Sequence, residues 1–247
     1  MWLDIPGDIQ NAQIDPDTLK VVQGSVIEVE EESIEQEVRQ VVEWLKCARR
    51  PMLHIGQGVR ISKAGDLLLK LLDQLPIPLA TTWNATDVID SEHPCFVGRP
   101  GVFSERAANF IVQNADLHIA IGTRLPFMVT GYNAKDFARE SKRVMVDIDP
   151  KETKKKSLDV HLKIVSDAGR FLSCLMELLT EENQIDSEWL GRCQALRNRY
   201  PIVDPQYSLQ EEWVNSYYFI QMLSDALDSE AAVMTDMGLS FVGTHQA

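Results

Sequence analysis

The chain has 247 residues, of which 45% are hydrophobic, so it can bury a sizeable core and global disorder is excluded. Its net charge of −13 argues against nucleic acids and anionic membranes as its main partners. The four cysteines lie far apart and no apolar run approaches the roughly 20 residues of a membrane span. We therefore expect a cytoplasmic protein with free thiols.

The N-terminal part of the chain is predicted to be a domain end followed by a linker. Residues 1–10 have the pattern of a last strand and a turn, and residues 11–32 are polar, contain Pro16 and show no helical period. A helix is expected from Ser33, which can cap it, because apolar residues then recur at helical spacing. These apolar positions are Val38, Val41, Val42 and Leu45.

From residue 33 to residue 181, short apolar segments alternate with longer helical patterns. The segments predicted to be strands are 52–55, 77–81, 117–121, 143–148 and 162–165, and those predicted to be helices are 62–73, 104–114 and 168–179. Strands that alternate with helices predict an α/β fold, in which a doubly wound, mainly parallel sheet carries helices on both faces. We expect a Rossmann-like central domain with partial flanking segments.

A glycine turn follows the first of these strands. Gly56-Gln57-Gly58 between a strand and a helix can form a pocket of backbone N–H groups that suits a phosphate. The dinucleotide fingerprint has a third glycine where this chain has Ile61, and an acidic residue about 20 positions further on, where residues 78–82 carry none. The pattern disfavours NAD, and a tight turn without a ligand remains an alternative.

Polar residues and glycines also follow the other predicted strands. They are Thr81-Thr82, Gly98-Arg99, Gly122-Thr123-Arg124, Asp147-Ile148-Asp149 and Ser166-Asp167. In an open α/β sheet, ligands bind at the edge formed by the carboxyl ends of the strands. Glycine permits close approach, arginine pairs with phosphate, and aspartate can hold a ribose. The set predicts a nucleotide-type crevice, either occupied or vestigial.

The C-terminal part of the chain departs from this alternation. A connector over residues 182–212 with a charged helix at 187–200 is expected, then a helix at 216–227 and a strand at 231–235. One helix and one strand cannot bury their apolar faces alone. Residues 213–247 are therefore predicted to be the truncated start of a further domain.

The remaining polar residues do not form a recognisable reaction centre. His54 and His118 lie inside apolar strands, which is typical of a core or a crevice wall. No cluster has the spacing of zinc ligands, and neither a Gly-x-Ser-x-Gly elbow nor a Gly-x-x-x-x-Gly-Lys-Ser/Thr loop is present. We predict no catalytic residue and no metal ligand in this chain.

Nearly the whole chain resembles consecutive parts of thiamine-diphosphate (ThDP) enzymes of the acetolactate synthase type. Residues 3–10 are similar to the segment that closes the first, pyrimidine-binding domain, residues 33–179 to the central domain, and residues 213–247 to the opening of the third, diphosphate-binding domain. The stretches shared with the central domain are Arg50-Pro51 through Gly58, Ala115-Asp116-Leu117 through Gly122-Thr123-Arg124, Val129-Thr130-Gly131 and Val146-Asp147-Ile148-Asp149-Pro150. The expected parts are thus a domain tail (1–10), a linker (11–32), a central nucleotide-binding-like domain (33–181), a connector (182–212) and a third-domain start (213–247).

The resemblance implies a homodimeric or tetrameric parent enzyme that decarboxylates a 2-keto acid and passes the acyl carbanion equivalent to an acceptor. In that family a glutamate of the first domain and a Gly-Asp-Gly motif of the third hold ThDP and Mg²⁺, and both fall outside this chain. Only Gly238, Leu239 and Ser240 match the diphosphate-side loop. The fragment itself is expected to be inactive.

Acetolactate synthases also bind FAD in the central domain. The contacts that the resemblance implies here are Gly56, Gly58, Thr82, Arg124, Asp147, Asp149 and Asp167. Two stretches depart from the family: Gly98-Arg99-Pro100-Gly101 replaces Gly-Met-His-Gly, and Pro126-Phe127-Met128 replaces an Asp-Asp-Arg run. Related decarboxylases and lyases keep the fold and bind an ADP-type nucleotide or nothing, so FAD and ADP both remain open. A non-catalytic nucleotide-binding or scaffolding module, and another ThDP-dependent decarboxylase or lyase, are the alternatives.

Overall fold

The computed structural model describes residues 4–20, 33–228 and 230–247. The chain divides into two units, residues 1–32 and residues 33–247. The described part of the first unit holds a short helix, α1 (Gly7–Gln10), and a 3-10 turn, η1 (Pro16–Thr18), and all of its residues are exposed. The expected strand end is not formed at residues 4–10: no strand of the described residues pairs with them, and Gly7–Gln10 forms a helical turn instead. Part of the predicted linker, residues 21–32, lies outside the described residues.

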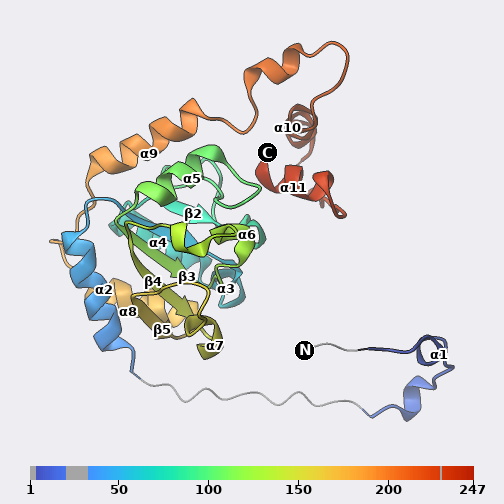
Figure 1. The fold of residues 1–247 in the computed structure, drawn as a ribbon, viewed down its shortest axis with the longest axis horizontal. Helices are drawn as coiled ribbons and strands as arrows, with labels where there is room; N and C mark the ends of the chain where they lie inside the picture. The colour runs from blue at the N-terminus through green and yellow to red at the C-terminus, as the bar shows by residue number, and fades with distance from the viewer. Residues whose placement is uncertain (1–3, 21–32, 229) are drawn as a thin grey trace. The chain divides into compact units, whose positions relative to one another are not determined.

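The second unit is built on a five-stranded sheet in which all strands are parallel (Figure 1). The strands are β1 (Pro51–Ile55), β2 (Leu79–Thr81), β3 (Leu117–Ile121), β4 (Lys142–Asp147) and β5 (Leu162–Val165). Their order is β2-β1-β3-β4-β5, and an isolated parallel bridge joins Leu79 to Phe96 at the β2 edge. All five strands predicted between residues 33 and 181 are therefore confirmed, as is the mainly parallel sheet.

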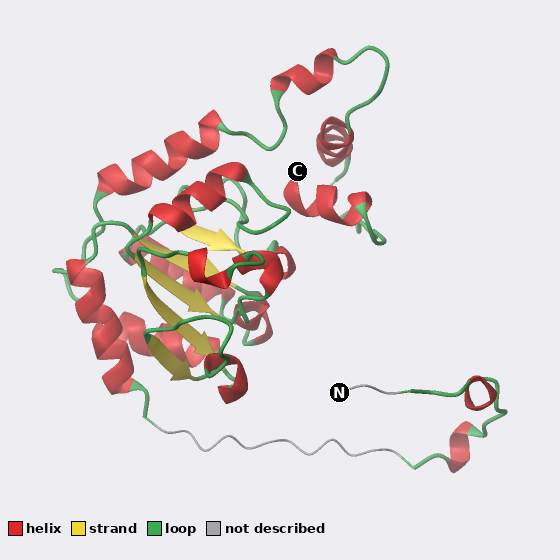
Figure 2. Ribbon diagram, in the orientation of Figure 1, coloured by secondary structure: helices red, strands yellow, loops and turns green. Residues whose placement is uncertain are grey.

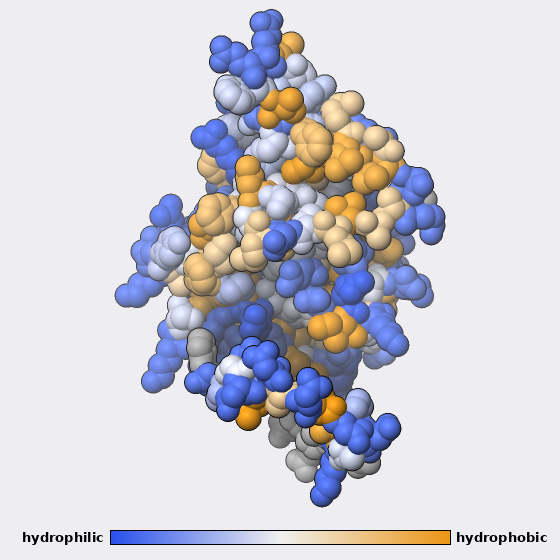
Figure 3. Space-filling model, turned by 90° about the vertical axis from the view of Figure 1, so that its right-hand side faces the viewer, coloured by the Kyte–Doolittle hydropathy of each residue, from blue (hydrophilic) through white to orange (hydrophobic). Residues whose placement is uncertain are grey.

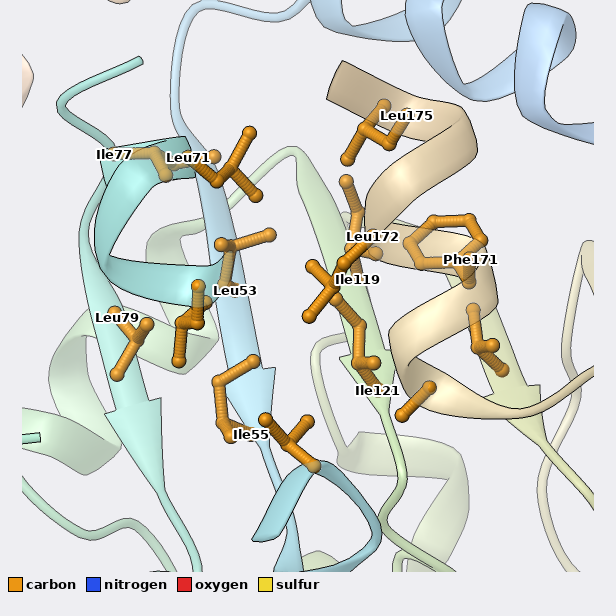
Figure 4. Close-up of a cluster of buried hydrophobic side chains, with 14 of the residues drawn as sticks. Leu53, Ile55, Leu71, Ile77, Leu79, Ile119, Ile121, Phe171, Leu172 and Leu175 are labelled. Carbon is orange, nitrogen blue, oxygen red and sulfur yellow. The ribbon is translucent and has the colours of Figure 1, made fainter. Parts of the chain in front are cut away.

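Helices cover both faces of the sheet (Figure 2). On one face lie α2 (Glu35–Cys47), α3 (Gln57–Ile61), α4 (Gly65–Gln74) and α8 (Ala168–Leu178), and on the other lie α5 (Arg106–Asn114) and α9 (Ser187–Arg199). Successive residues of a strand point to opposite faces, so each strand contributes to two cores. In β1, Leu53 and Ile55 belong to the first core (Figure 4) and Met52 to the second. The α/β prediction with helices on both faces is confirmed.

Two predicted elements differ from those observed. The helix expected at 62–73 begins only at Gly65, as α4, because Lys63 has a left-handed φ of 56° that interrupts a helix. The short helix α3 precedes it at residues 57–61, where a glycine turn was expected. The strand expected at 231–235 is not formed, since no strand of the described residues lies beside it to pair with its backbone. Its apolar residues Val233 and Met234 are exposed.

The remaining helical elements are shorter or lie near the C-terminus. They are η2 (Trp83–Ala85), α6 (Phe127–Thr130), η3 (Ala134–Asp136), α7 (Pro150–Thr153), η4 (Pro205–Leu209), α10 (Ser216–Ala226) and α11 (Leu239–Gln246). Apolar side chains gather in the upper half of the view in Figure 3, where α10 and α11 lie. Among the described residues, no helix combines the length and apolar composition that crossing a membrane requires.

Candidate functional site

The strand order places a natural crevice between β1 and β3. From β1 the chain continues outward to β2, whereas from β3 it continues in the opposite direction to β4 and β5. The loops after β1 and β3 therefore leave the sheet in opposite directions, and ligands of doubly wound sheets bind at this switch point, beside the carboxyl ends of the strands. This is the edge at which the sequence predicts a nucleotide crevice.

Glycines hold the two turns at this switch point against each other. The N–H of Gly56 donates to the carbonyl of Ile121 and the N–H of Gly58 to that of Gly122, both at 2.9 Å. A Cβ added to Gly58 would lie 2.6 Å from the Cα of Gly122, so no side chain fits there. Both glycine N–H groups are thus engaged within the protein, and a phosphate-binding role for Gly56 and Gly58 stays a prediction.

A pocket of about 390 Å³ opens beside these turns. Its lining residues are Gln57, Thr82, Trp83, Asn84, Pro100, Gly122, Thr123, Arg124, Pro126, Met128, Val129 and Phe241. Trp83 and Phe241 pack edge to face, with ring centroids 5.5 Å apart, and form an aromatic wall. This volume lies within the range of small-molecule sites. The pocket combines apolar walls with a few polar groups.

Arg124 is the cationic group of the pocket. Its side chain is 72% exposed, and its nearest carboxylate is Glu152, at 4.0 Å. The loop that carries it is fixed by Lys155, whose Nζ donates to the carbonyls of Arg124 and Leu125. Burial lowers the pKa of Lys155, while nearby Glu152 opposes this change. The guanidinium therefore projects from a fixed backbone and remains available to an anion.

The parallel sheet and its switch-point loops match a known protein family. Residues 38–175 match the family described as "Thiamine pyrophosphate enzyme, central domain", thiamine pyrophosphate being another name for ThDP. The chain belongs to this family. The matched region contains the whole parallel sheet and the loops of the switch point. The central-domain resemblance is therefore confirmed.

Relatives of this chain include acetolactate synthases. The isozyme 2 large subunit of Escherichia coli (strain K12) is 30% identical over 236 residues, which are 96% of this chain and 40% of that protein. The large subunit of Corynebacterium glutamicum is 32% identical, over 81% of this chain and 32% of its own length. Chloroplastic acetolactate synthase 2 of Zea mays is 29% identical over 96% of this chain and 37% of its own length. The chain thus spans about two fifths or less of the length of these relatives.

The structure brings together only part of the predicted nucleotide contacts of this ThDP-family domain. Thr82 and Arg124 line the pocket. Asp149 and Asp167 instead cap helices: Asp149 accepts from the Lys151 N–H at 2.8 Å at the start of α7, and Asp167 accepts at 2.8 Å from the Gly169 N–H at the start of α8. These two aspartates have a local structural role at the same sheet edge.

Asp147 also lies at this edge but outside the pocket lining. Its carboxylate accepts from the N–H of Asp149 at 2.9 Å, and only 8% of the residue is exposed. Burial raises the pKa of this carboxyl. Gly238, with a φ of 88°, precedes α11, and the Ser240 hydroxyl donates to the Asp236 carbonyl at 3.1 Å. None of these three residues reaches the pocket of Arg124.

The described residues offer fewer suitable ligands for ThDP and Mg²⁺ than for an ADP-type nucleotide. For ThDP and Mg²⁺, the matching loop offers a hydroxyl that is already bonded, and no group of three or more potential metal ligands occurs among the described residues. These donors do not suffice for a metal-bound diphosphate. The pocket fits an ADP-type group better, because Arg124 can pair with phosphate and the Trp83–Phe241 wall can pack against a planar ring.

Sequence reasoning missed the aromatic wall. Trp83 directly follows the predicted strand end Thr81-Thr82, and this adjacency was a usable signal. Phe241 comes from a segment more than a hundred residues further along the chain, so only the tertiary fold brings it to the pocket. His54 and His118, expected either in the core or at a crevice wall, are both fully buried.

Proposed function

We propose that this chain is the central portion of a ThDP-dependent, acetolactate synthase-like enzyme. The whole protein decarboxylates a 2-keto acid and transfers the resulting acyl carbanion equivalent to an acceptor. The proposal rests on one observation: acetolactate synthases align with 96% of the chain, including both flanks of the family-matched central domain. ThDP would supply the carbanion stabilisation, with Mg²⁺ holding its diphosphate.

The flanking segments are assigned on the same basis. Residues 1–10 close the pyrimidine-binding domain, residues 11–32 and 182–212 connect domains, and residues 213–247 begin the diphosphate-binding domain, with Gly238 and Ser240 in its first loop. Large exposed apolar side chains support this assignment of 213–247, because such a surface is typical of a segment that packs against further protein. They include Trp213 (79% exposed), Met237 (85%) and Met234 (94%). The parent enzyme would be a homodimer or tetramer that shares its cofactor sites between subunits.

Within this enzyme, the described crevice is proposed to hold an ADP-type nucleotide, alone or as part of FAD. Arg124 pairs with a phosphate, Thr82 donates a hydrogen bond, and Trp83 packs against the ring system. Gly56, Gly58, Asp147, Asp149 and Asp167 are proposed to contribute through the loops they shape, because their N–H groups and carboxylates bond within the protein.

A second candidate is a purely structural central domain that binds no nucleotide. The engaged N–H groups of Gly56 and Gly58 favour it, since the turn that phosphates occupy in dinucleotide-binding proteins is closed here by the loop after β3. The crevice would then be vestigial, and the domain would only connect its neighbours.

Calorimetric titration of the purified chain with ADP, FAD, NAD and ThDP–Mg²⁺ separates these candidates. We expect saturable binding of ADP or FAD, weaker binding of NAD and no sub-micromolar binding of ThDP–Mg²⁺. A chain that binds none of the nucleotides supports the structural candidate. A tight NAD complex contradicts the assignment of the crevice, and a sub-micromolar ThDP–Mg²⁺ complex contradicts the claim that essential cofactor ligands lie outside this chain.

A further inference from the structure

A second cavity, separate from the nucleotide crevice, lies where the loop before α5 meets the end of α9. Its volume is about 360 Å³. The lining residues that matter for its chemistry are Ser91, Arg99, Glu105, Arg197, Tyr200 and Gln221. Two arginines from distant parts of the chain therefore face one polar cavity. The ThDP-family reaction proposed above uses neither of them.

Arg99 is a buried cation with an incomplete set of partners. The residue is 8% exposed, and its Nη1 donates to Glu105 at 3.2 Å while its Nη2 donates to Ser91 at 3.3 Å. Its Nε is buried without a hydrogen-bond partner among the described residues. An unsatisfied buried donor of a charged group costs free energy, so a ligand that accepts from it is favoured.

Arg197 supplies a second cation beside the first. Its guanidinium lies over the ring of Phe96, 5.0 Å from the centroid, and Arg99 lies over the same ring at the same distance. In the described part of the chain Arg197 makes no hydrogen bond within the protein, so its donors are available to a ligand. A guanidinium presents these donors as a planar fork that matches the oxygens of a carboxylate or phosphate.

The charges around the cavity leave a place for an anion. Glu105 is 6% exposed and neutralises Arg99 through a buried ion pair. Arg197 is half-buried and also interacts electrostatically with Glu105, while the exposed Glu92 and the last residue, Ala247, line the cavity beside it. Arg106 and Arg199 pack on Tyr200, at 5.3 and 5.4 Å from its ring centroid. A protein with a net charge of −13 thus concentrates arginines around one cavity.

We propose that this cavity binds a small oxyanion, whose oxygens accept from the Nε of Arg99 and the fork of Arg197. The shared chemistry is that of a carboxylate or phosphate group, which a small organic acid or free inorganic phosphate can supply. The hydroxyl of Ser91 and the amide of Gln221 offer further donors at the cavity wall. Arg99 lines this cavity, and its neighbour in sequence, Pro100, lines the nucleotide crevice, so the two cavities share this segment of the chain.

The test is calorimetric titration of the chain in a chloride-poor buffer with inorganic phosphate, and separately with acetate and pyruvate. The wild-type chain is expected to bind at least one probe saturably at one site. Binding of phosphate alone identifies phosphate as the ligand type, and binding of acetate or pyruvate alone identifies a carboxylate. The absence of saturable binding of every probe up to about 20 mM, well above the weak millimolar affinities of small ligands, overturns the proposal.

Variants distinguish this site from general attraction by surface arginines. Arg197→Gln is expected to weaken binding about tenfold or more, and Arg197→Lys, which keeps the charge but loses the fork, to weaken it less. Arg199→Gln is the matched control, since Arg199 is exposed in the same helical turn and does not line the cavity. It is expected to bind like wild type. Equal losses in Arg197→Gln and Arg199→Gln overturn the proposal, as does unchanged binding in folded Arg197→Gln or, if that variant does not fold, in Arg197→Lys.

Discussion

Gly58, in the short helix α3 that follows β1, and Gly122, in the turn after β3, lie back to back and share a hydrogen bond of 2.9 Å from the Gly58 N–H to the Gly122 carbonyl. Gly122 has a φ of 61°, which favours glycine, and its own added Cβ would meet the Gly58 Cα at 2.7 Å. This contact closes the base of the crevice. Close packing against Gly122 therefore requires glycine at positions 56 and 58, although the full dinucleotide fingerprint is absent.

Replacing Gly58 with alanine is expected to lower the free energy of unfolding by about 1–3 kcal/mol, because the added Cβ overlaps the backbone of Gly122, which cannot rotate away. The control is Gly191→Ala. Gly191 lies inside α9 with open space around its Cβ position, so alanine there should raise stability by about 0.5–1 kcal/mol. Urea unfolding measures both. Equal stability of Gly58→Ala and wild type contradicts the described contact.

The nucleotide assignment predicts a specific role for Arg124. Arg124→Gln should weaken ADP binding by about 1.5–3 kcal/mol, the usual contribution of a hydrogen bond to a charged group, without lowering stability, because this side chain is exposed. Arg139→Gln is the control, since Arg139 is also exposed and lies outside the pocket. Calorimetry with ADP measures both affinities. If the two variants bind ADP equally, Arg124 is not a phosphate contact.

Substitutions of Asp167 test whether its side chain caps α8 or contacts a ligand. Asp167→Ala should lower the free energy of unfolding by about 1 kcal/mol, because α8 loses the acceptor for its first N–H groups. Asp167→Asn retains an acceptor and should unfold like wild type. Thermal and urea unfolding of the two variants test this role. A loss of stability in Asp167→Asn equal to that in Asp167→Ala indicates that the negative charge, rather than capping, matters.

Because of the two buried histidines, His54 and His118, we expect the folded state to lose stability in acid. His54 Nδ1 lies 3.1 Å from His118 Nε2, and burial lowers the pKa of His54 to about 4 and that of His118 well below 6.5. Both are therefore neutral in the folded state, whereas the unfolded chain takes up protons below pH 6.5. The stability that depends on the neutral form of the two histidines is therefore fully present above pH 6.5 and is lost as the pH falls toward 4. For His54 alone, the loss between pH 7 and pH 5 is about 2 kcal/mol.

Urea unfolding over this pH range measures the effect. A variant with leucine at both His54 and His118 removes both titrating groups and should show a flatter pH dependence. A pH slope that persists unchanged in the leucine variant shows that other groups cause the loss of stability in acid.

The sequence allowed the sheet to be predicted because its strands are continuous apolar runs, such as Leu117–Ile121, that fit burial on both faces. It could not show that Lys63 takes a left-handed φ and that the helix expected at 62–73 begins only at Gly65, since this depends on how the segment after β1 packs. The strand expected at 231–235 failed for the converse reason. An apolar run becomes a strand only beside a partner, and no partner strand is described there.

The candidate site was predictable only where its residues follow a strand directly. Thr82 and Arg124 were named because each stands at a strand end, and both line the pocket. Asp149 and Asp167 stand at the same edge, but their carboxylates turn back to cap helices, which the sequence pattern does not distinguish from a ligand contact. The approach of Arg197 to Arg99 joins segments almost a hundred residues apart and is a property of the tertiary fold.

The proposed ThDP-dependent activity is tested by CO2 release from 2-keto acids by the protein purified from its source cell at its native length, measured with and without added ThDP and Mg²⁺. We expect CO2 release from at least one 2-keto acid, lost when ThDP is removed and restored when it is returned. Release that is indifferent to ThDP, or no release from any member of a panel of 2-keto acids, contradicts this expectation.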